Sequence, residues 1–154
     1  MIRVTEKPVE VLLVEDNPAE VRLITLLFQQ TKLNCKIANA KDGEEATDYL
    51  FNKVKNKEAL SPELIILDLN LPGKDGRKVL EEIKEEPSTR RIPVLILTTS
   101  QAAEDISRCY ELHANCYITK PSDMMRYNAV MRSIEEFWFS TAELPLPQIA
   151  RGGW

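Results

Sequence analysis

A short apolar run that ends in a single carboxylate constrains this chain most. Residues 64–67 are Leu-Ile-Ile-Leu, Asp68 follows them directly, and the turn-forming pair Pro72-Gly73 comes soon after. Four consecutive aliphatic residues are typical of a strand buried on both faces, as in a parallel sheet. In open parallel sheets, ligands bind beyond the carboxyl ends of the strands, and Asp68 would lie at such an end. Taken alone, Asp68 is more simply explained as a turn cap, so the rest of the chain has to decide.

Strand-like and helix-like segments alternate along the whole chain. The first helical segment shows the pattern, because Val21, Ile24 and Phe28 recur at helical spacing. Such alternation predicts a parallel sheet with helices on both faces and right-handed connections. The fold class is therefore α/β, a doubly wound, flavodoxin-like (βα)5 arrangement of five parallel strands. The predicted strands are 9–14, 34–38, 64–67, 93–97 and 116–118, and the predicted helices are 18–30, 44–51, 77–85, 102–112 and 122–139.

Size and composition are those of one globular domain. The chain has 154 residues, of which 44% are hydrophobic and 29% charged, with a formal net charge of −4. This charge argues against a general nucleic-acid binder, which usually presents a basic face. No apolar run approaches the roughly 18 residues that a membrane span needs, and no signal peptide is visible. We expect a cytoplasmic protein with a domain over residues 9–140, an N-terminal extension over 1–8 and a C-terminal tail over 141–154.

Cysteine and histidine give little support for thiol or zinc chemistry. Cys35, Cys109 and Cys116 are odd in number and lack the spacing of metal ligands. We interpret them as reduced, small hydrophobic side chains. The single histidine, His113, has no orienting partner nearby, so a Cys-His nucleophile is disfavoured. A surface position at a helix end is the expected place for His113.

Charged and hydroxyl side chains follow four of the five predicted strands. Glu15 and Asp16 follow the first, Asp68 the third, Thr98 the fourth and Lys120 the fifth. In a doubly wound sheet these ends meet at one crevice. Three carboxylates there would repel one another without a cation, and Mg²⁺ with oxygen ligands is the natural candidate. An ammonium group and a hydroxyl opposite the acids suit a phosphoryl group, with a carboxylate as its nucleophile.

With this cluster, the chain resembles the receiver domains of response regulators in two-component signalling. The resemblance covers about residues 9–139 and depends on four motifs in matching order and strand context. They are Val-Glu-Asp-Asn at 14–17, Asp-Leu-Asn-Leu-Pro-Gly-Lys-Asp-Gly at 68–76, Pro-Val-Leu-Ile-Leu-Thr-Thr-Ser at 93–100 and Tyr-Ile-Thr-Lys-Pro at 117–121.

The resemblance implies a role for each matching carboxylate. Asp68 would take a phosphoryl group from a histidine kinase in a Mg²⁺-dependent reaction. Asp16, Asp68 and the backbone carbonyl of Asn70 would bind Mg²⁺, with Glu15 acting directly or through water. Gly76 would let the chain turn tightly before the third helix.

The resemblance also implies how a signal would leave the site. Thr98 and Lys120 would contact the phosphoryl group, Lys120 next to a cis bond to Pro121. A phosphoryl group adds an anion with strong acceptor oxygens, so Thr98 would move towards it and Tyr117 would turn inward as the switch. This two-state change would reshape the surface of residues 102–112, 116–118 and 122–139.

The end of the last helix and the length of one connection indicate partners. No output domain follows residue 139, so we expect signalling through protein contacts and no direct binding of nucleic acid. Phe137, Trp138 and Phe139 are consecutive, so they cannot all face the core, and we consider them candidates for a homodimer interface. The long stretch 52–62 and the aromatic-rich end resemble the small response regulators of cyanobacterial phytochrome kinases. That resemblance implies a red-light-sensing kinase as phosphodonor and a homodimer through the side made by residues 102–112, 116–118 and 122–139.

Three alternatives compete with the interpretation of the chain as a signalling domain. A metal-dependent phosphatase or phosphotransferase needs a second carboxylate beside its nucleophile, and Asn70 occupies that place. A flavodoxin-like binding protein needs a phosphate-cradling loop after the first strand, where Glu15 and Asp16 would repel a phosphate. A degenerate, unphosphorylated receiver would lack a required residue, and every required position is intact. We therefore expect a signalling protein and not an enzyme.

Overall fold

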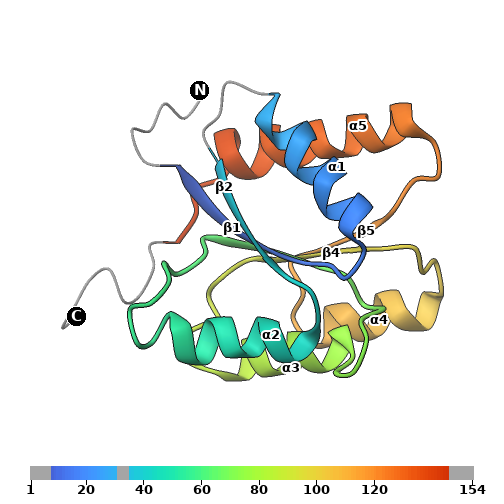
Figure 1. Ribbon diagram of the computed structural model, residues 1–154. Coiled ribbons are helices and arrows are strands. Elements are labelled where there is room, and N and C mark those ends of the chain that lie inside the picture. Colours follow the sequence, from blue (N-terminus) through green and yellow to red (C-terminus); the bar gives the residue numbers. More distant parts are fainter. Residues whose placement is uncertain (1–7, 31–34, 146–154) are drawn as a thin grey trace.

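The computed structural model describes residues 8–30 and 35–145, and within them the chain forms a sheet between two helical layers (Figure 1). Five parallel strands make up the sheet in the order β2-β1-β3-β4-β5. This is the predicted doubly wound α/β fold, in which β1 lies near the centre and the strand order reverses beside it. The elements are β1 (Val9–Val14), α1 (Pro18–Gln29), β2 (Cys35–Ala40), α2 (Gly43–Asp48), β3 (Leu64–Leu67), α3 (Gly76–Glu85), β4 (Val94–Thr98), α4 (Ala103–Glu111), β5 (Cys116–Thr119) and α5 (Met124–Ile134).

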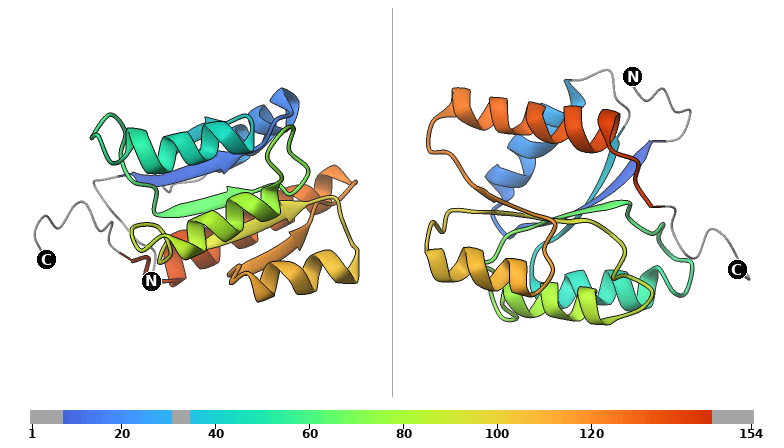
Figure 2. Two further views of the ribbon diagram at one scale, coloured as in Figure 1. Left: turned by 90° about the horizontal axis from the view of Figure 1, so that it is seen from below. Right: turned by 180° about the vertical axis from the view of Figure 1, so that it is seen from behind.

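Each face of the sheet is covered by its own set of helices (Figures 1 and 2). Helices α1 and α5 lie on one face, and α2, α3 and α4 lie on the other. The central strands are buried on both sides because alternate residues face opposite layers. Leu12 and Val14 pack with the cluster beneath α2 and α3, whereas Val11 and Leu13 pack with the cluster beneath α1 and α5.

Aspartate and asparagine side chains begin most of the helices. Asn17 Oδ1 accepts from the Ala19 N–H at 2.9 Å, and Asp42 Oδ1 accepts from the Glu45 N–H at 2.7 Å. Asp75 and Asp123 cap α3 and α5 in the same way. These side chains satisfy amide groups that a helix leaves unpaired in its first turn. The cap at Asp123 explains why α5 begins at Met124 and not at the predicted residue 122.

Two predicted helices change their winding before they end. The helix predicted over 44–51 is α-helical through Asp48 and continues as a π-helical segment, η1 (Tyr49–Lys53). The helix predicted over 122–139 is α-helical only to Ile134 and continues as η2 (Glu135–Thr141). Apolar spacing does not separate an α-helical turn from a π-helical one, so the change of winding was outside what the pattern predicts. The predicted start of the second strand at residue 34 lies outside the described residues, and β2 runs on to Ala40.

The cysteines, the histidine and the start of the predicted tail lie as follows in the structure. All three cysteines are free thiols; Cys109 is buried, and Cys35 and Cys116 are half-buried. His113 is exposed just after α4, as predicted, and has a positive φ of 72°. Leu144, in the predicted tail, is buried with the cluster beneath α1 and α5. Within the described ranges, every helix is too short or too polar to cross a bilayer.

Candidate functional site

Three carboxylates meet at the carboxyl edge of the sheet. Glu15 and Asp16 follow β1, and Asp68 follows β3, the strand hydrogen-bonded to β1. One carboxylate oxygen from each residue lies within 4.8 Å of the others. Glu15 and Asp68 are only 2% and 6% exposed, whereas Asp16 is exposed. The parallel pairing of β1 with β3 therefore brings Asp68 beside Glu15 and Asp16, which are far from it in sequence.

Lys120 places one ammonium group among these carboxylates. Its Nζ lies 2.6 Å from Glu15 Oε1, 2.9 Å from Asp68 Oδ2 and 3.6 Å from Glu20 Oε2. The Lys120 backbone N–H donates to the Thr98 carbonyl at 2.7 Å, which continues the pairing of β5 with β4 past the end of the strand. The ammonium is thereby held over the end of β3, where Asp68 lies.

The electrostatics of the site favour added positive charge. Burial raises the pKa of Glu15 to about 7, against the opposing effects of the Lys120 ammonium and the Asn17 N–H. Burial alone would lower the pKa of Lys120, but the hydrogen bonds and charges of Glu15 and Asp68 outweigh it and raise that pKa. A raised pKa for a buried carboxylate and a raised pKa for the ammonium beside it both indicate that the site favours added positive charge. A divalent cation would supply it.

The donor set fits a hard cation with oxygen ligands. Carboxylate oxygens are the ligands that Mg²⁺ prefers, usually together with retained water. The structure places Glu15, Asp16 and Asp68 close enough to share one ion. Asn70 donates its backbone N–H to Asp68 Oδ1 at 3.2 Å, which orients the Asp68 carboxylate. The role of the Asn70 carbonyl as a ligand stays a prediction.

Thr98 contributes a hydroxyl that has no partner in the described part of the chain. It is 0% exposed, and its Oγ1 makes no hydrogen bond there. Leaving a buried polar group unsatisfied costs about 1–3 kcal/mol, so an acceptor that enters the site would be stabilised by this hydroxyl. A phosphoryl oxygen is such an acceptor.

The loop between β3 and α3 approaches the site too closely to allow a side chain at Gly76. A Cβ there would collide with the Asp68 carbonyl oxygen and the Leu69 Cα. The Gly76 N–H donates to the Leu69 carbonyl at 3.0 Å, and Lys74 Nζ ties the loop to Thr47 Oγ1 at 3.1 Å. Glycine is needed here for close backbone approach. The predicted tight turn is present. Glycine is required at position 76 because a Cβ would collide with Asp68 and Leu69, and not because of a positive φ.

Tyr117 lies beside the site in a defined position. Its hydroxyl donates to the Ser100 carbonyl at 3.0 Å, and its ring packs on the cluster beneath α2 and α3 that also holds Leu12 and Val14. Ser100 Oγ lies 2.5 Å from Asp105 Oδ2, and Arg77 Nη2 lies 2.6 Å from Asp105 Oδ1. These bonds join the start of α3, the loop after β4 and the first turn of α4. The inward movement predicted for Tyr117 stays a prediction.

Residues outside the predicted motifs also reach the site. Tyr127 of α5 donates its hydroxyl to Glu20 Oε2 at 2.6 Å, the same oxygen that faces Lys120. Asn39 of β2 donates its side-chain amide to the Glu15 carbonyl at 3.2 Å. The sequence reasoning missed Glu20, Tyr127 and Asn39, because no local motif predicts which helix packs beside α1 or what an edge strand donates.

The prediction of a cis bond between Lys120 and Pro121 is wrong, since every peptide bond in the described residues is trans. The trans form is favoured before proline by about 0.5–1 kcal/mol.

As expected, the three aromatics after α5 do not all face the core. Phe139 is buried edge-on against Phe28, with ring centroids 5.5 Å apart, whereas Phe137 is 52% exposed.

Comparison with known proteins identifies the family. A family model described as the response regulator receiver domain matches residues 11–132. The chain belongs to this receiver-domain family. The matched range lies inside the predicted domain over residues 9–140, whose own bounds stay a prediction.

Individual proteins of this family are similar to the chain over nearly its whole length. Response regulator Rcp1 of Synechocystis sp. (strain ATCC 27184 / PCC 6803 / Kazusa) is 41% identical over 138 residues, covering 90% of this chain and 94% of Rcp1. The crystal structure of its Mn²⁺-bound form has a TM-score of 0.85 and covers 90% of this chain and 99% of that one. The phosphorylated cyanobacterial phytochrome response regulator RcpA has the same TM-score, 0.85, with 45% identity and coverages of 90% and 99%. The probable methanogenesis regulatory protein FilR2 of Methanothrix harundinacea (strain 6Ac) is 37% identical over 142 residues, covering 92% of this chain and 91% of FilR2.

Membership in the family settles the class of function. Receiver domains of response regulators work with histidine kinases, and a protein of this kind is a signalling protein rather than an enzyme. The predicted resemblance to cyanobacterial phytochrome response regulators is confirmed. The family typically binds a divalent metal, and the acidic group of Glu15, Asp16 and Asp68 has the composition for one.

Proposed function

We propose that Asp68 accepts a phosphoryl group from a histidine kinase in a Mg²⁺-dependent reaction, and that the protein signals through changed protein contacts. One observation carries this proposal. The buried Asp68 carboxylate lies 2.9 Å from the Lys120 ammonium, in an acidic group and at the same edge of the sheet as the unpartnered hydroxyl of Thr98. A nucleophile, a cation and a donor thus stand where three neighbouring strands end.

The residues divide the work of the transfer. A carboxylate oxygen of Asp68 forms a bond to phosphorus while the bond between phosphorus and the donor's imidazole nitrogen breaks. The nitrogen keeps the electron pair of that bond, and the imidazole leaves as a neutral group with the proton that its other ring nitrogen already carries. Lys120 then donates to the phosphoryl oxygens instead of the Asp68 carboxylate, and the Thr98 hydroxyl gains the acceptor that it lacks. Glu15, Asp16, Asp68 and the Asn70 carbonyl would hold Mg²⁺, which when bound supplies positive charge to the phosphoryl oxygens.

Intact mass tests this assignment. Wild type, Asp68→Asn and Asp123→Asn are incubated with acetyl phosphate, with and without Mg²⁺. Asp123 is an exposed helix cap, and asparagine caps helices as well as aspartate does, so this control should behave as wild type. We expect a Mg²⁺-dependent gain of one phosphoryl mass in wild type and in the control, and none in Asp68→Asn. No gain in wild type would contradict the proposal.

We further propose a phytochrome-type histidine kinase as the phosphodonor. RcpA is a phytochrome response regulator by its description, and its identity to this chain is 45%. FilR2, described as a probable methanogenesis regulator, is 37% identical, so likeness alone does not name the kinase. The test is phosphoryl transfer from an autophosphorylated cyanobacterial phytochrome kinase and from an unrelated histidine kinase. Faster transfer from the phytochrome kinase, absent in Asp68→Asn, supports the assignment, and equal transfer from both opposes it.

The output is proposed to pass through a homodimer formed by the side of α4, β5 and α5. Apolar side chains exposed on α4 and beyond α5 support this choice, since Tyr110 is 49% and Phe137 52% exposed. Light scattering of wild type and Phe137→Ser, with and without acetyl phosphate and Mg²⁺, measures the effect. We expect Phe137→Ser to lower the dimer fraction, and an unchanged mass would exclude Phe137 from the interface.

A further inference from the structure

Asp16 differs from the other two acids of the site in how it is held. Glu15 and Asp68 each accept hydrogen bonds from Lys120, at 2.6 Å and 2.9 Å. Asp16 is exposed, and within residues 8–30 and 35–145 no hydrogen bond or ion pair to its carboxylate is found. The position of this carboxylate therefore depends on the backbone that carries it.

That backbone is bound on one side by the edge strand β2. The Glu15 N–H donates to the Ala40 carbonyl at 3.0 Å, which extends the pairing of β1 with β2 by one residue. On the other side of the residue, the Glu15 carbonyl accepts from Asn39 Nδ2 at 3.2 Å. A peptide unit is planar, so the bond to the Glu15 carbonyl also fixes the amide nitrogen of Asp16.

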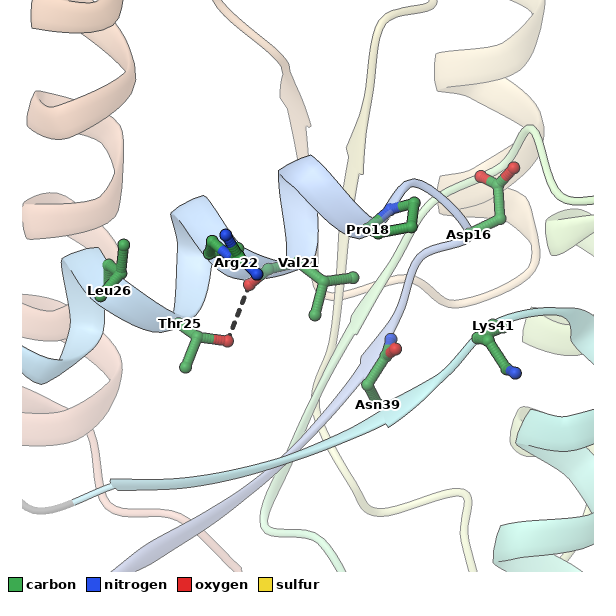
Figure 3. Close-up of a pocket in the computed structure, with 8 residues that line it drawn as sticks. All are labelled: Asp16, Pro18, Val21, Arg22, Thr25, Leu26, Asn39 and Lys41. Atoms are coloured by element: carbon green, nitrogen blue, oxygen red, sulfur yellow. Dashed lines mark hydrogen bonds between the residues drawn. The ribbon is translucent and has the colours of Figure 1, made fainter.

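The side-chain amide of Asn39 shares its two N–H groups among three backbone carbonyls. Its Nδ2 donates to the carbonyls of Leu13 at 3.0 Å and Ala40 at 3.2 Å, as well as to that of Glu15. Figure 3 shows its amide directed from β2 towards β1, beneath the turn that carries Asp16, while the Asp16 carboxylate points away from it. Only the bond to Ala40 is local; the other two cross to β1, 26 and 24 residues away in sequence.

Ordinary explanations for an asparagine at this place do not account for the contacts. Asparagine is disfavoured in strands, so the propensity of β2 does not select it. Asparagine side chains commonly bond their own neighbouring backbone in turns, yet two of the three acceptors here lie on another strand. The helix-capping role next to the site belongs to Asn17. What remains is the orientation of the turn between β1 and α1.

We propose that Asn39 is a positioning residue of the metal site, which holds the Glu15–Asp16 peptide so that Asp16 can share an ion with Glu15 and Asp68. The inference rests on the proposed function, because it assigns a residue to the binding of Mg²⁺. Groups that orient metal ligands from behind commonly change metal affinity by about 10–100-fold when they are removed. Asn39 would act through the backbone of a ligand and never touch the ion.

Calorimetric titration of Mg²⁺ into the full chain, without phosphodonor, measures the effect. The variants are Asn39→Ala and Asn39→Val, since valine removes the amide while favouring a strand. Asn115→Ala is the matched control, because Asn115 Oδ1 accepts from the Val94 N–H at 2.9 Å and so joins two strands at the opposite end of the sheet. We expect both Asn39 variants to bind Mg²⁺ about tenfold more weakly than wild type, and Asn115→Ala to keep wild-type affinity. Melting temperatures without metal show which variants lose stability alone.

The outcomes distinguish a failure of the role of Asn39 from a failure of the proposed Mg²⁺-dependent function. Weaker Mg²⁺ binding in both Asn39 variants, with acetyl phosphate labelling restored at saturating Mg²⁺, supports a positioning role. Wild-type affinity in both variants overturns the inference and leaves the proposed function standing, as does an equal loss of affinity in Asn115→Ala. If wild type binds no Mg²⁺, the metal part of the proposed function fails, and the role of Asn39 fails with it.

Discussion

Two partly buried lysines at opposite ends of the sheet differ in the charge of the groups that their ammonium groups contact. Lys120, at the carboxyl edge, faces the carboxylates of Glu15 and Asp68 at 2.6 and 2.9 Å. Lys84 faces the amino ends of β4 and β5. Among residues 8–30 and 35–145 it donates only to neutral oxygens: the carbonyl of Arg90 at 3.1 Å, the carbonyl of Ile92 at 2.9 Å and Asn115 Oδ1 at 3.0 Å.

The pKa values of the two groups shift in opposite directions. Burial lowers the pKa of Lys84 to about 8, because neutral oxygens do not offset the loss of solvation. The pKa of Lys120 is raised in spite of burial, since two carboxylates outweigh it. At the amino end the bonds of Lys84 join α3 to the connections that precede β4 and β5. At the carboxyl end there is an excess of negative charge and a hydroxyl without a partner in the described residues. The contacts at the amino end stabilise the fold, whereas the groups at the carboxyl end favour the binding of a ligand.

Replacing Lys120 should have the largest effect. In Lys120→Met the Glu15 and Asp68 carboxylates lose their cation, and breaking a buried ion pair costs about 3–5 kcal/mol. Without the ammonium the folded-state pKa of Glu15, which burial already raises to about 7, rises further above its unfolded value. A raised carboxyl pKa gives stability at low pH that is lost as pH rises through the folded pKa. We therefore expect the loss in unfolding free energy, measured by urea titration in chelator, to be larger near pH 8.5 than near pH 5.5.

Added Mg²⁺ should restore part of the stability of Lys120→Met, whereas labelling of Asp68 by acetyl phosphate should stay strongly reduced. An equal loss of stability at both pH values would show that the carboxylates do not depend on this ammonium. The comparison between the two ends of the sheet would then be wrong.

Replacing Lys84 should cost stability and leave the chemistry intact. Lys84→Met removes the donor to the carbonyls of Arg90 and Ile92 and to the Asn115 side chain. We expect a loss of about 1 kcal/mol in unfolding free energy, mainly from the partly buried bond to the Ile92 carbonyl, because water can reach the other two acceptors. The extent of Mg²⁺-dependent labelling should equal that of wild type. A loss of labelling in the folded variant would contradict the separation of the two ends.

The pH dependence of stability should distinguish the lysines more finely. The folded pKa of Lys84, about 8, lies below its ordinary value of 10.5. Between these values the unfolded chain binds a proton that the folded chain does not, so the contribution of Lys84 to stability rises with pH and falls as pH drops through the folded pKa. The stability of wild type relative to Lys84→Met should therefore increase from about pH 7 to about pH 10. Urea titrations of both proteins at the two pH values measure it, and a constant difference would exclude the shift.

The sequence predicted the part of the site that topology alone determines. Glu15, Asp16, Asp68, Thr98 and Lys120 were predicted at strand ends, because parallel strands of a doubly wound sheet bring those ends to one edge. The contacts that hold these residues depend on packing between distant elements. Tyr127 reaches Glu20 only because α5 lies beside α1, and Asn39 reaches Glu15 only because β2 pairs with β1 in one register. Arg77 and Asp105 meet because α3 and α4 cover the same face. No local motif carries such information.

The smallest effect should come from Tyr117, which lies at the reactive end but bonds a neutral oxygen as Lys84 does. Its hydroxyl donates to the Ser100 carbonyl at 3.0 Å, while its half-buried ring packs on the cluster beneath α2 and α3. Tyr117→Phe keeps the ring, and water can replace the lost donor at a partly exposed carbonyl, so the cost should be about 1 kcal/mol or less. Labelling of Asp68 should match wild type, and the change in dimer fraction after labelling should persist, because packing of the ring rather than its hydroxyl would carry the switch. Tyr49→Phe is the control for removal of a hydroxyl, because the Tyr49 hydroxyl also donates to a backbone carbonyl, that of Leu60 at 3.3 Å, and lies outside the proposed dimer surface. If Tyr117→Phe is labelled fully but no longer changes its contacts, the bond to Ser100 is part of the signal, and the reactive end of the sheet extends as far as the loop after β4.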